Sequence, residues 1–158
     1  MWFLKVFEKL NKDKINYAVV GGFAVALHGA ARGTIDLDII VKLTADSLKS
    51  TEECLKELGF ISKLPITAKD LYSFREEYIN NKNLVAWSFY NPKKPAQIVD
   101  IIITHDLKKM RTKTLRVQGT TIRFLSIGDL IKMKKQSGRP QDLEDISALE
   151  RLKWKRHY

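Results

Sequence analysis

The sequence predicts an α+β fold in which helices flank a small mixed β-sheet. Three observations support this: apolar residues recur at helical spacing near the start, β-branched stretches occupy the middle, and helix start and stop signals follow residue 125. The 158 residues suit one domain with a single apolar core. We expect that domain to span 1–158, with its core at about 15–125 and C-terminal helices at about 126–155.

The first half of the chain is predicted to alternate helices and strands. Residues 2–10 carry apolar side chains close to helical spacing, and residues 15–20 form a β-branched run that ends at Gly21-Gly22. A short helix follows and stops at Gly29. Further along, we expect a strand at 34–43, a helix at 44–58 and a helix at about 67–80.

The second half is predicted to add two long strands, a hairpin and two helices. The strands, at 84–90 and 96–104, are separated by the turn-rich sequence NPKKP. The hairpin joins strands at 114–117 and 120–125 through Gln118-Gly119. Ser126, with Asp129 three residues later, resembles the capping box that begins a helix. That helix ends at Gly138, and the last helix begins at Pro140.

Composition excludes several classes of protein. A single cysteine, Cys54, leaves no internal disulfide framework and no cysteine cluster for zinc. No apolar run approaches the ~20 residues that a membrane span needs, and the first residues resemble a helix rather than a signal peptide. We therefore expect a soluble, cytoplasmic protein without a membrane partner.

Positive charge is concentrated in the last third of the chain. The net charge is +10, yet residues 1–107 hold 14 basic and 13 acidic residues, whereas residues 108–158 hold 14 basic and 5 acidic ones. Such asymmetry favours a polyanionic partner, for example nucleic acid or a nucleotide phosphate. A lysine-rich solvated surface is the alternative interpretation.

Three aspartates occur in predicted strands, where apolar residues are the norm. Asp36 and Asp38 alternate with apolar neighbours, so both side chains project to the same face. Asp100 lies between Val99 and Ile101 in a second apolar strand. A carboxylate buried there costs several kcal/mol unless it is solvated, paired or bound to a metal. Exposure on the open face of a half-covered sheet is the alternative.

The glycine pair gives these aspartates a chemical context. Glycines between a strand and a helix let a phosphate approach the backbone, although such a pair is often only a turn. Here thirteen residues separate Gly22 from Asp36. A phosphate-binding turn and three acids are the components of two-metal phosphoryl chemistry. Oxygen ligands without nearby histidine or cysteine indicate Mg²⁺, with Mn²⁺ as an alternative.

A resemblance to a known family rests on residues 19–41, which read VVGGFAVALHGAARGTIDLDIIV. This pattern resembles the signature of the DNA polymerase beta-like nucleotidyltransferase superfamily: a glycine pair, then Asp-x-Asp on a strand, with a third acid on a later strand. It is most similar to the small prokaryotic minimal-nucleotidyltransferase and abortive-infection toxin-like branches. Residues 129–149 are similar to the closing pattern D-L-I-x-x-K followed by G-R-x-x-D-x-x-D.

The resemblance implies a nucleotidyltransferase fold and a set of site residues. Asp36, Asp38 and Asp100 would be catalytic and would hold two Mg²⁺ ions. The resemblance also implies five residues that would contact the nucleotide phosphates: Gly21, Gly22, Arg32, Thr34 and Lys134.

The implied reaction moves an NMP unit from an NTP to a hydroxyl and releases pyrophosphate. The acceptor is left open among an RNA or tRNA end, an antibiotic, another small molecule and a protein side chain. Because few residues remain for a second substrate domain, a protein partner or a homodimer could help to hold it.

Other functions fit the residues less well. A non-catalytic nucleotide-binding module, or an interaction module of a toxin–antitoxin pair with the same fold, is the main alternative, but it would not need three acids. A two-metal nuclease would place a lysine at Ile102, and an aspartate-nucleophile phosphatase would place a threonine at Ile40. His28 and Cys54 are predicted to be packed residues.

Overall fold

The computed structural model describes residues 1–31, 33 and 36–155, and it confirms the α+β fold class. Within these residues, a mixed seven-stranded sheet has the strand order β3-β4-β5-β2-β1-β7-β6. The strands are β1 (Tyr17–Val20), β2 (Leu37–Val41), β3 (Ile61–Ser62), β4 (Ala86–Asn91), β5 (Lys94–Ile102), β6 (Thr112–Val117) and β7 (Thr120–Leu125). The helices are α1 (Trp2–Lys12), α2 (Gly21–Leu27), α3 (Ala45–Glu57), α4 (Ala68–Lys82), α5 (Ile127–Ser137) and α6 (Pro140–Lys155), with a 3₁₀ turn, η1 (Leu107–Lys109).

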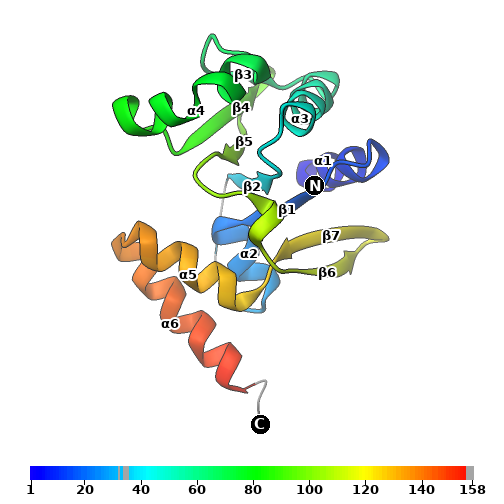
Figure 1. Ribbon diagram of the computed structural model, residues 1–158. Helices are drawn as coiled ribbons and strands as arrows, with labels where there is room; N and C mark the ends of the chain where they lie inside the picture. Colours follow the sequence, from blue (N-terminus) through cyan, green and yellow to red (C-terminus); the bar gives the residue numbers. More distant parts are fainter. Residues whose placement is uncertain (32, 34–35, 156–158) are drawn as a thin grey trace.

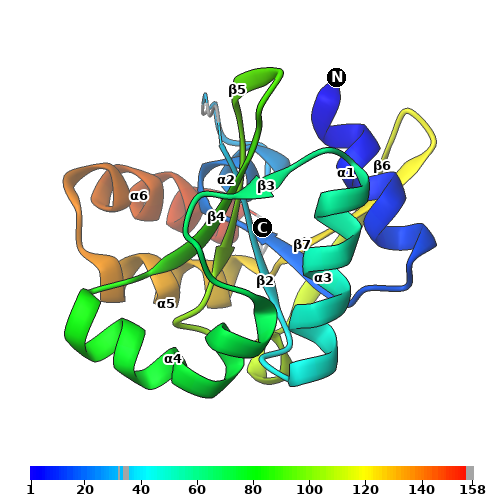
Figure 2. The ribbon, with the colours of Figure 1, turned by 90° about the horizontal axis from the view of Figure 1, so that it is seen from above.

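The helices form layers on both sides of the sheet (Figure 2). Seen from above, α1 and α3 lie on one side and α5 and α6 on the other. The central strands β1 and β2 are buried along almost their whole length, as expected for strands covered on both faces. Trp87 and Phe89 of β4 belong to this core, as does Cys54 of α3, whose predicted burial is confirmed.

Several predicted boundaries follow from local chemistry. The Ser126 hydroxyl accepts a hydrogen bond from the Asp129 amide, which begins α5 as expected. Gly138 adopts φ +64° at the end of α5, a conformation that favours glycine. Asn83 ends α4 in the same left-handed region.

The strand predicted at 34–43 is shorter than expected, and this changes the position of one aspartate. β2 begins at Leu37, so Asp36 lies in a bend just before the strand. The reason is the sheet register: β1 pairs with β2 only as far as Val20 opposite Asp38, because the chain enters α2 at Gly21. The short strand β3 and the turn η1 were not predicted, and each is too brief to produce a periodic pattern.

The C-terminal helices form an antiparallel pair beside the sheet. α5 and α6 pack against each other, and the end of α6 extends away from the rest of the protein (Figure 1). Across the described residues, no helix is long and apolar enough to cross a membrane.

Candidate functional site

A row of polar side chains crosses neighbouring strands of the sheet. Asp38 of β2 is in register with Asp100 of the parallel strand β5, and Asp100 is in register with Ser88 of the antiparallel strand β4. Residues in register project to the same face, so the sheet brings these three side chains together. The Ser88 hydroxyl donates a hydrogen bond of 2.5 Å to Asp100 Oδ1.

The aspartates affect each other's charge. Burial, reinforced by the neighbouring Asp100 carboxylate and a hydrogen bond with it, raises the pKa of Asp38 well above its usual range. Partial burial and the charge of Asp100 also raise the pKa of Asp36, while the Lys63 ammonium opposes this shift. The three acids therefore form one site of crowded negative charge at the start of β2.

Gly21 is adjacent to this acidic group. It has φ +66°, and a Cβ atom built at this position would collide with the Asp38 carboxylate. Only glycine therefore allows the first residue of α2 and the Asp38 side chain to approach this closely. Gly22, the next residue of α2, is buried.

A cavity of about 560 Å³ opens from Gly21 and Asp38 towards α5. Apolar side chains supply much of its wall, and they are Val20, Val85, Ile102, Leu130 and Met133. A polar rim includes His105 and Gln136, whose Nε2 and Oε1 atoms lie 2.6 Å apart. An apolar chamber with charged groups at one end is the usual form of a small-molecule site.

A buried ionic network joins α5 to α6 at the wall of this cavity. Lys134 Nζ donates to Asp145 Oδ2 at 2.8 Å and to Asp142 Oδ1 at 3.4 Å, and all three side chains are at most 7% exposed. Arg139, which is mostly exposed, donates to Asp142 through Nε at 2.9 Å. Burial disfavours the Asp142 carboxylate, but hydrogen bonds from Arg139 and Ser137 outweigh it and lower the pKa of Asp142 to about 2.

The family model for nucleotidyltransferases of unknown function (DUF6036) matches residues 3–154. The chain belongs to this family. The predicted superfamily and the nucleotidyltransferase fold are thereby confirmed.

Solved structures share the fold of this DUF6036 chain at low sequence identity. A lincomycin-bound lincosamide antibiotic adenylyltransferase superposes with a TM-score of 0.64 at 14% identity, with 96% of each chain covered. A putative nucleotidyltransferase from Thermotoga maritima gives 0.59 at 17% identity, covering 98% of this chain and 90% of that one. An antigenic nucleotidyltransferase-like protein from Paracoccidioides brasiliensis gives 0.57 at 21% identity, covering 92% and 72%. No curated protein sequence matches this chain.

The other predicted site residues have varied positions in this DUF6036 chain. Arg32 and Thr34 lie outside the described residues. Lys134 borders the cavity, but its ammonium group is held by two carboxylates rather than directed into open space. His28 is packed as predicted: it is 3% exposed, and its Nε2 lies 2.8 Å from the carbonyl oxygen of Leu125.

Sequence reasoning missed Ser88, His105 and Gln136. Ser88 reaches the site only through the register of β4 on β5, which no local pattern reveals. His105 and Gln136 meet although they are 31 positions apart along the chain. The only local signal for His105 was its position in the polar stretch 104–106, which follows an apolar run.

The acidic side chains have the donor chemistry of a divalent-cation site. Carboxylate oxygens without histidine or cysteine suit Mg²⁺ or Mn²⁺, and burial together with the Asp100 charge raises the pKa of Asp38. Among the described residues, no three His, Cys, Asp or Glu side chains are gathered closely enough to enclose a metal ion. Asp38 and Asp100 are in register and share a hydrogen bond, and Asp36 interacts with both through its charge.

Ser88→Ala should weaken the site without unfolding the protein. The variant removes the hydroxyl that orients Asp100, and loss of such a supporting hydrogen bond costs about 10- to 100-fold in metal affinity or activity. We expect Mn²⁺ affinity, measured by calorimetry, to fall within that range while the melting temperature changes little. Ser88→Thr, which keeps the hydroxyl, is the matched control, and equal affinity in all three proteins would contradict the assignment.

Proposed function

We propose that the protein transfers an NMP unit from an NTP to a hydroxyl group. The observation that supports this best is the contact between Asp38 and Asp100 in register on β2 and β5, at the end of a cavity bounded by Gly21. Two acids on adjacent strands beside a glycine turn are what phosphoryl transfer requires. Membership of a nucleotidyltransferase family agrees with this arrangement.

In this proposal the nucleotide lies in the cavity with its phosphates at the Gly21 end. The backbone of Gly21 and Gly22 would contact the triphosphate, with further contacts from Arg32 and Thr34. Arg139 and Lys134 bring positive charge to the same cavity, and the charge of Lys134 opposes the rise in the pKa of Asp38. The apolar wall would then face the nucleoside.

The chemical step is a substitution at the α-phosphorus. The acceptor hydroxyl oxygen forms a bond to that phosphorus, the bond to the oxygen bridging to the β-phosphate breaks, and pyrophosphate leaves. Asp100 accepts the hydroxyl proton, and Ser88 keeps its carboxylate in place. Asp36, Asp38 and Asp100 would hold two Mg²⁺ ions, which when bound would neutralise the acids and stabilise the charge on the phosphate oxygens.

The test measures transfer directly. Purified protein is incubated with Mg²⁺ and each α-labelled NTP, alone and with RNA, tRNA, small-molecule alcohols or a cell extract. We expect one class of acceptor to become labelled, with stoichiometric release of pyrophosphate and complete loss of labelling in EDTA. NTP binding that is independent of metal and of Asp38, with no labelled product, would instead identify a non-catalytic nucleotide-binding module.

A further inference from the structure

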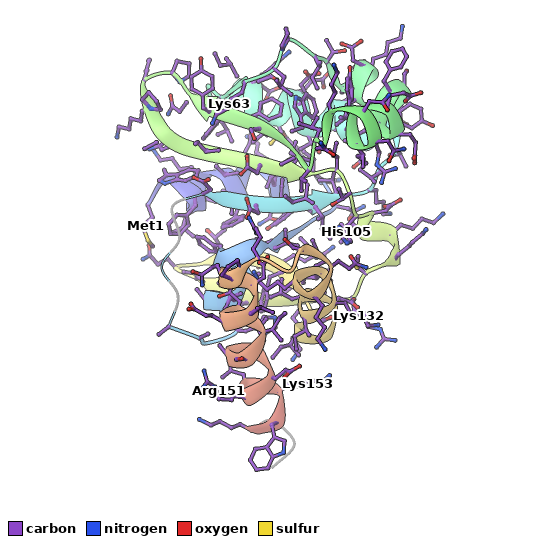
Figure 3. All side chains as sticks on the ribbon, turned by 90° about the vertical axis from the view of Figure 1, so that its left-hand side faces the viewer. Met1, Lys63, His105, Lys132, Arg151 and Lys153 are labelled. Atoms are coloured by element: carbon purple, nitrogen blue, oxygen red, sulfur yellow. The ribbon has the colours of Figure 1, made fainter. Side chains whose placement is uncertain are left out.

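A second cavity, of about 430 Å³, lies between the start of α1, the residues that follow α3 and the turn that joins β4 to β5. Gln97 of β5 lines it, whereas Ile102 of the same strand lines the first cavity. Residues an odd number of positions apart project to opposite faces of a strand, so the two cavities lie on opposite faces of the sheet. In Figure 3, Met1 at the second cavity and His105 at the first lie on opposite sides of the molecule.

Three exposed lysines line the second cavity. Lys5 belongs to α1, Lys94 begins β5, and Lys93 precedes it in the turn. Of the described residues that line this cavity, none is acidic, and none of the three ammonium groups has an ion pair or a hydrogen bond within the described part of the chain. α1 has no side-chain cap and no acid in its first turn, so its first backbone amides add partial positive charge.

Carboxylates on the adjoining helices reduce this positive charge only in part. Glu57, at the end of α3, pairs with Lys9 at 2.5 Å, and Lys9 also pairs with Asp13 at 2.9 Å. Asp13 is eight residues from Lys5, about 12 Å along α1, which exceeds the Debye length of about 8 Å in physiological salt. Glu8 is one turn from Lys5 and accepts a hydrogen bond from β7 at 3.1 Å. These acids stay charged, but they do not line the cavity, whereas the three lysines do.

The hydrogen-bonding groups that remain available in the second cavity are mostly donors. Asn91 Nδ2 donates to Gln97 Oε1 at 3.1 Å, and Asn91 Oδ1 accepts from the Lys93 amide at 3.0 Å. Both side-chain oxygens are therefore engaged within the hairpin, while Gln97 Nε2 has no partner among the described residues. Ammonium and amide N–H groups together require a ligand that is rich in acceptors and negatively charged, and a phosphate group meets both conditions.

The rest of the wall is apolar. Val6 and Phe60 are 1% and 4% exposed, Leu58 is half-buried, and the Trp2 and Phe60 rings lie 6.0 Å apart. An inorganic phosphate would leave this wall uncovered, whereas a ring attached to the phosphate would bury it. The volume lies in the range of small-molecule sites, which are concave and combine an apolar wall with a few polar groups.

We propose that the second cavity binds a small organic phosphate that carries a planar apolar ring. The phosphate contacts the three lysines and Gln97 Nε2, and the ring lies against Trp2. This inference goes beyond the proposed function and is independent of it, because the second cavity includes none of the acidic residues of the candidate site.

The test measures binding of 1-naphthyl phosphate by calorimetry, in EDTA so that no divalent cation assists binding at the acidic site. Lys5→Gln/Lys94→Gln removes two charges from the second cavity. Lys49→Gln/Lys69→Gln, which removes two exposed lysines from α3 and α4, is the matched control. The cavity variant should bind at least about fivefold more weakly, whereas the control should stay within about twofold of the wild type. All three proteins should have similar melting temperatures, because the substituted lysines are exposed.

Two further measurements test the ring and the phosphate separately. Inorganic phosphate and 1-naphthol should each bind the wild type at least about tenfold more weakly than 1-naphthyl phosphate, because each retains only one half of the ligand. Trp2→Leu keeps an apolar side chain on α1 but removes the aromatic surface. This variant should weaken binding of 1-naphthyl phosphate and leave binding of inorganic phosphate unchanged.

Four outcomes would overturn the inference. They are equal weakening in the two double variants, no saturable binding by the wild type at millimolar 1-naphthyl phosphate, and 1-naphthol binding as tightly as its phosphate. The fourth is weaker binding in Asp38→Asn with none in Lys5→Gln/Lys94→Gln, which would place the probe in the first cavity. Nucleotidyl transfer is not needed for any of these measurements, so their result leaves the proposed function unaffected.

Discussion

Asp38→Asn should reduce nucleotidyl transfer by at least about a thousandfold and leave the fold intact. The asparagine amide keeps the shape of the side chain but removes the Asp38 carboxylate, which lines the cavity and is in register with Asp100. In the proposed mechanism, the loss of this charge would remove a ligand of the divalent cations. Labelled transfer to the acceptor, measured at saturating NTP, is the readout.

The same Asp38→Asn substitution should leave the melting temperature unchanged or raise it. Because the pKa of Asp38 is raised in the folded protein, its charged form destabilises the fold at pH values above its ordinary range. Replacing it by a neutral amide removes this penalty, so we expect an unchanged or higher melting temperature. Glu53→Gln, on an exposed position of α3, should change neither quantity. Activity within tenfold of the wild type would rule out Asp38 as a catalytic acid.

Lys134→Met should cost about 3 kcal/mol of unfolding free energy, roughly 6–12 °C in melting temperature for a domain of this size. Methionine retains most of the aliphatic volume, but Asp145 and Asp142 then lose a buried ammonium partner at 2.8 and 3.4 Å. Removing one side of a buried ion pair is expensive because the remaining charge stays desolvated. Denaturant and thermal unfolding provide the measurement.

The neighbouring lysine supplies the control for this prediction. Lys135→Met removes an exposed charge from the same helix, where the pair with Glu150 spans 3.7 Å, and should cost at most about 1 kcal/mol. Adding Asp145→Asn to Lys134→Met should recover part of the lost stability. Similar losses in the two single lysine variants would show that the buried network does not stabilise the contact between α5 and α6.

Most of the helices and strands could be predicted because their signals are local. The alternation of apolar residues around Asp38 marks a buried strand, and Ser126 with Asp129 marks the start of a helix within one turn of chain. The boundary of β2 could not be predicted from its own residues, because β1 stops pairing with it where Gly21 turns into α2. This is why Asp36 lies in a bend and not in the strand.

Some features of the candidate site could likewise be predicted from local sequence, whereas others depend on tertiary packing. Gly21 and Asp38 belong to one short motif, so their closeness is visible in a stretch of 23 residues that resembles a known signature. The hydrogen bond from Ser88 to Asp100 depends on an antiparallel register between β4 and β5. The resemblance implied a phosphate contact for Lys134, and only the packing of α6 on α5 places its ammonium group between two buried carboxylates.

By itself, the amino-acid sequence determined the family, the order of most helices and strands, and the motif that combines a glycine pair with aspartates. It also determined the excess of positive charge after residue 107. The tertiary structure decided which carboxylates touch, which lysine is buried and where the exposed cations gather. The physical reason is the separation of the interacting residues along the chain. Helix caps, turns and alternating strands depend on residues a few positions apart. Desolvation and charge pairing depend on groups that the fold brings together from distant parts of the chain.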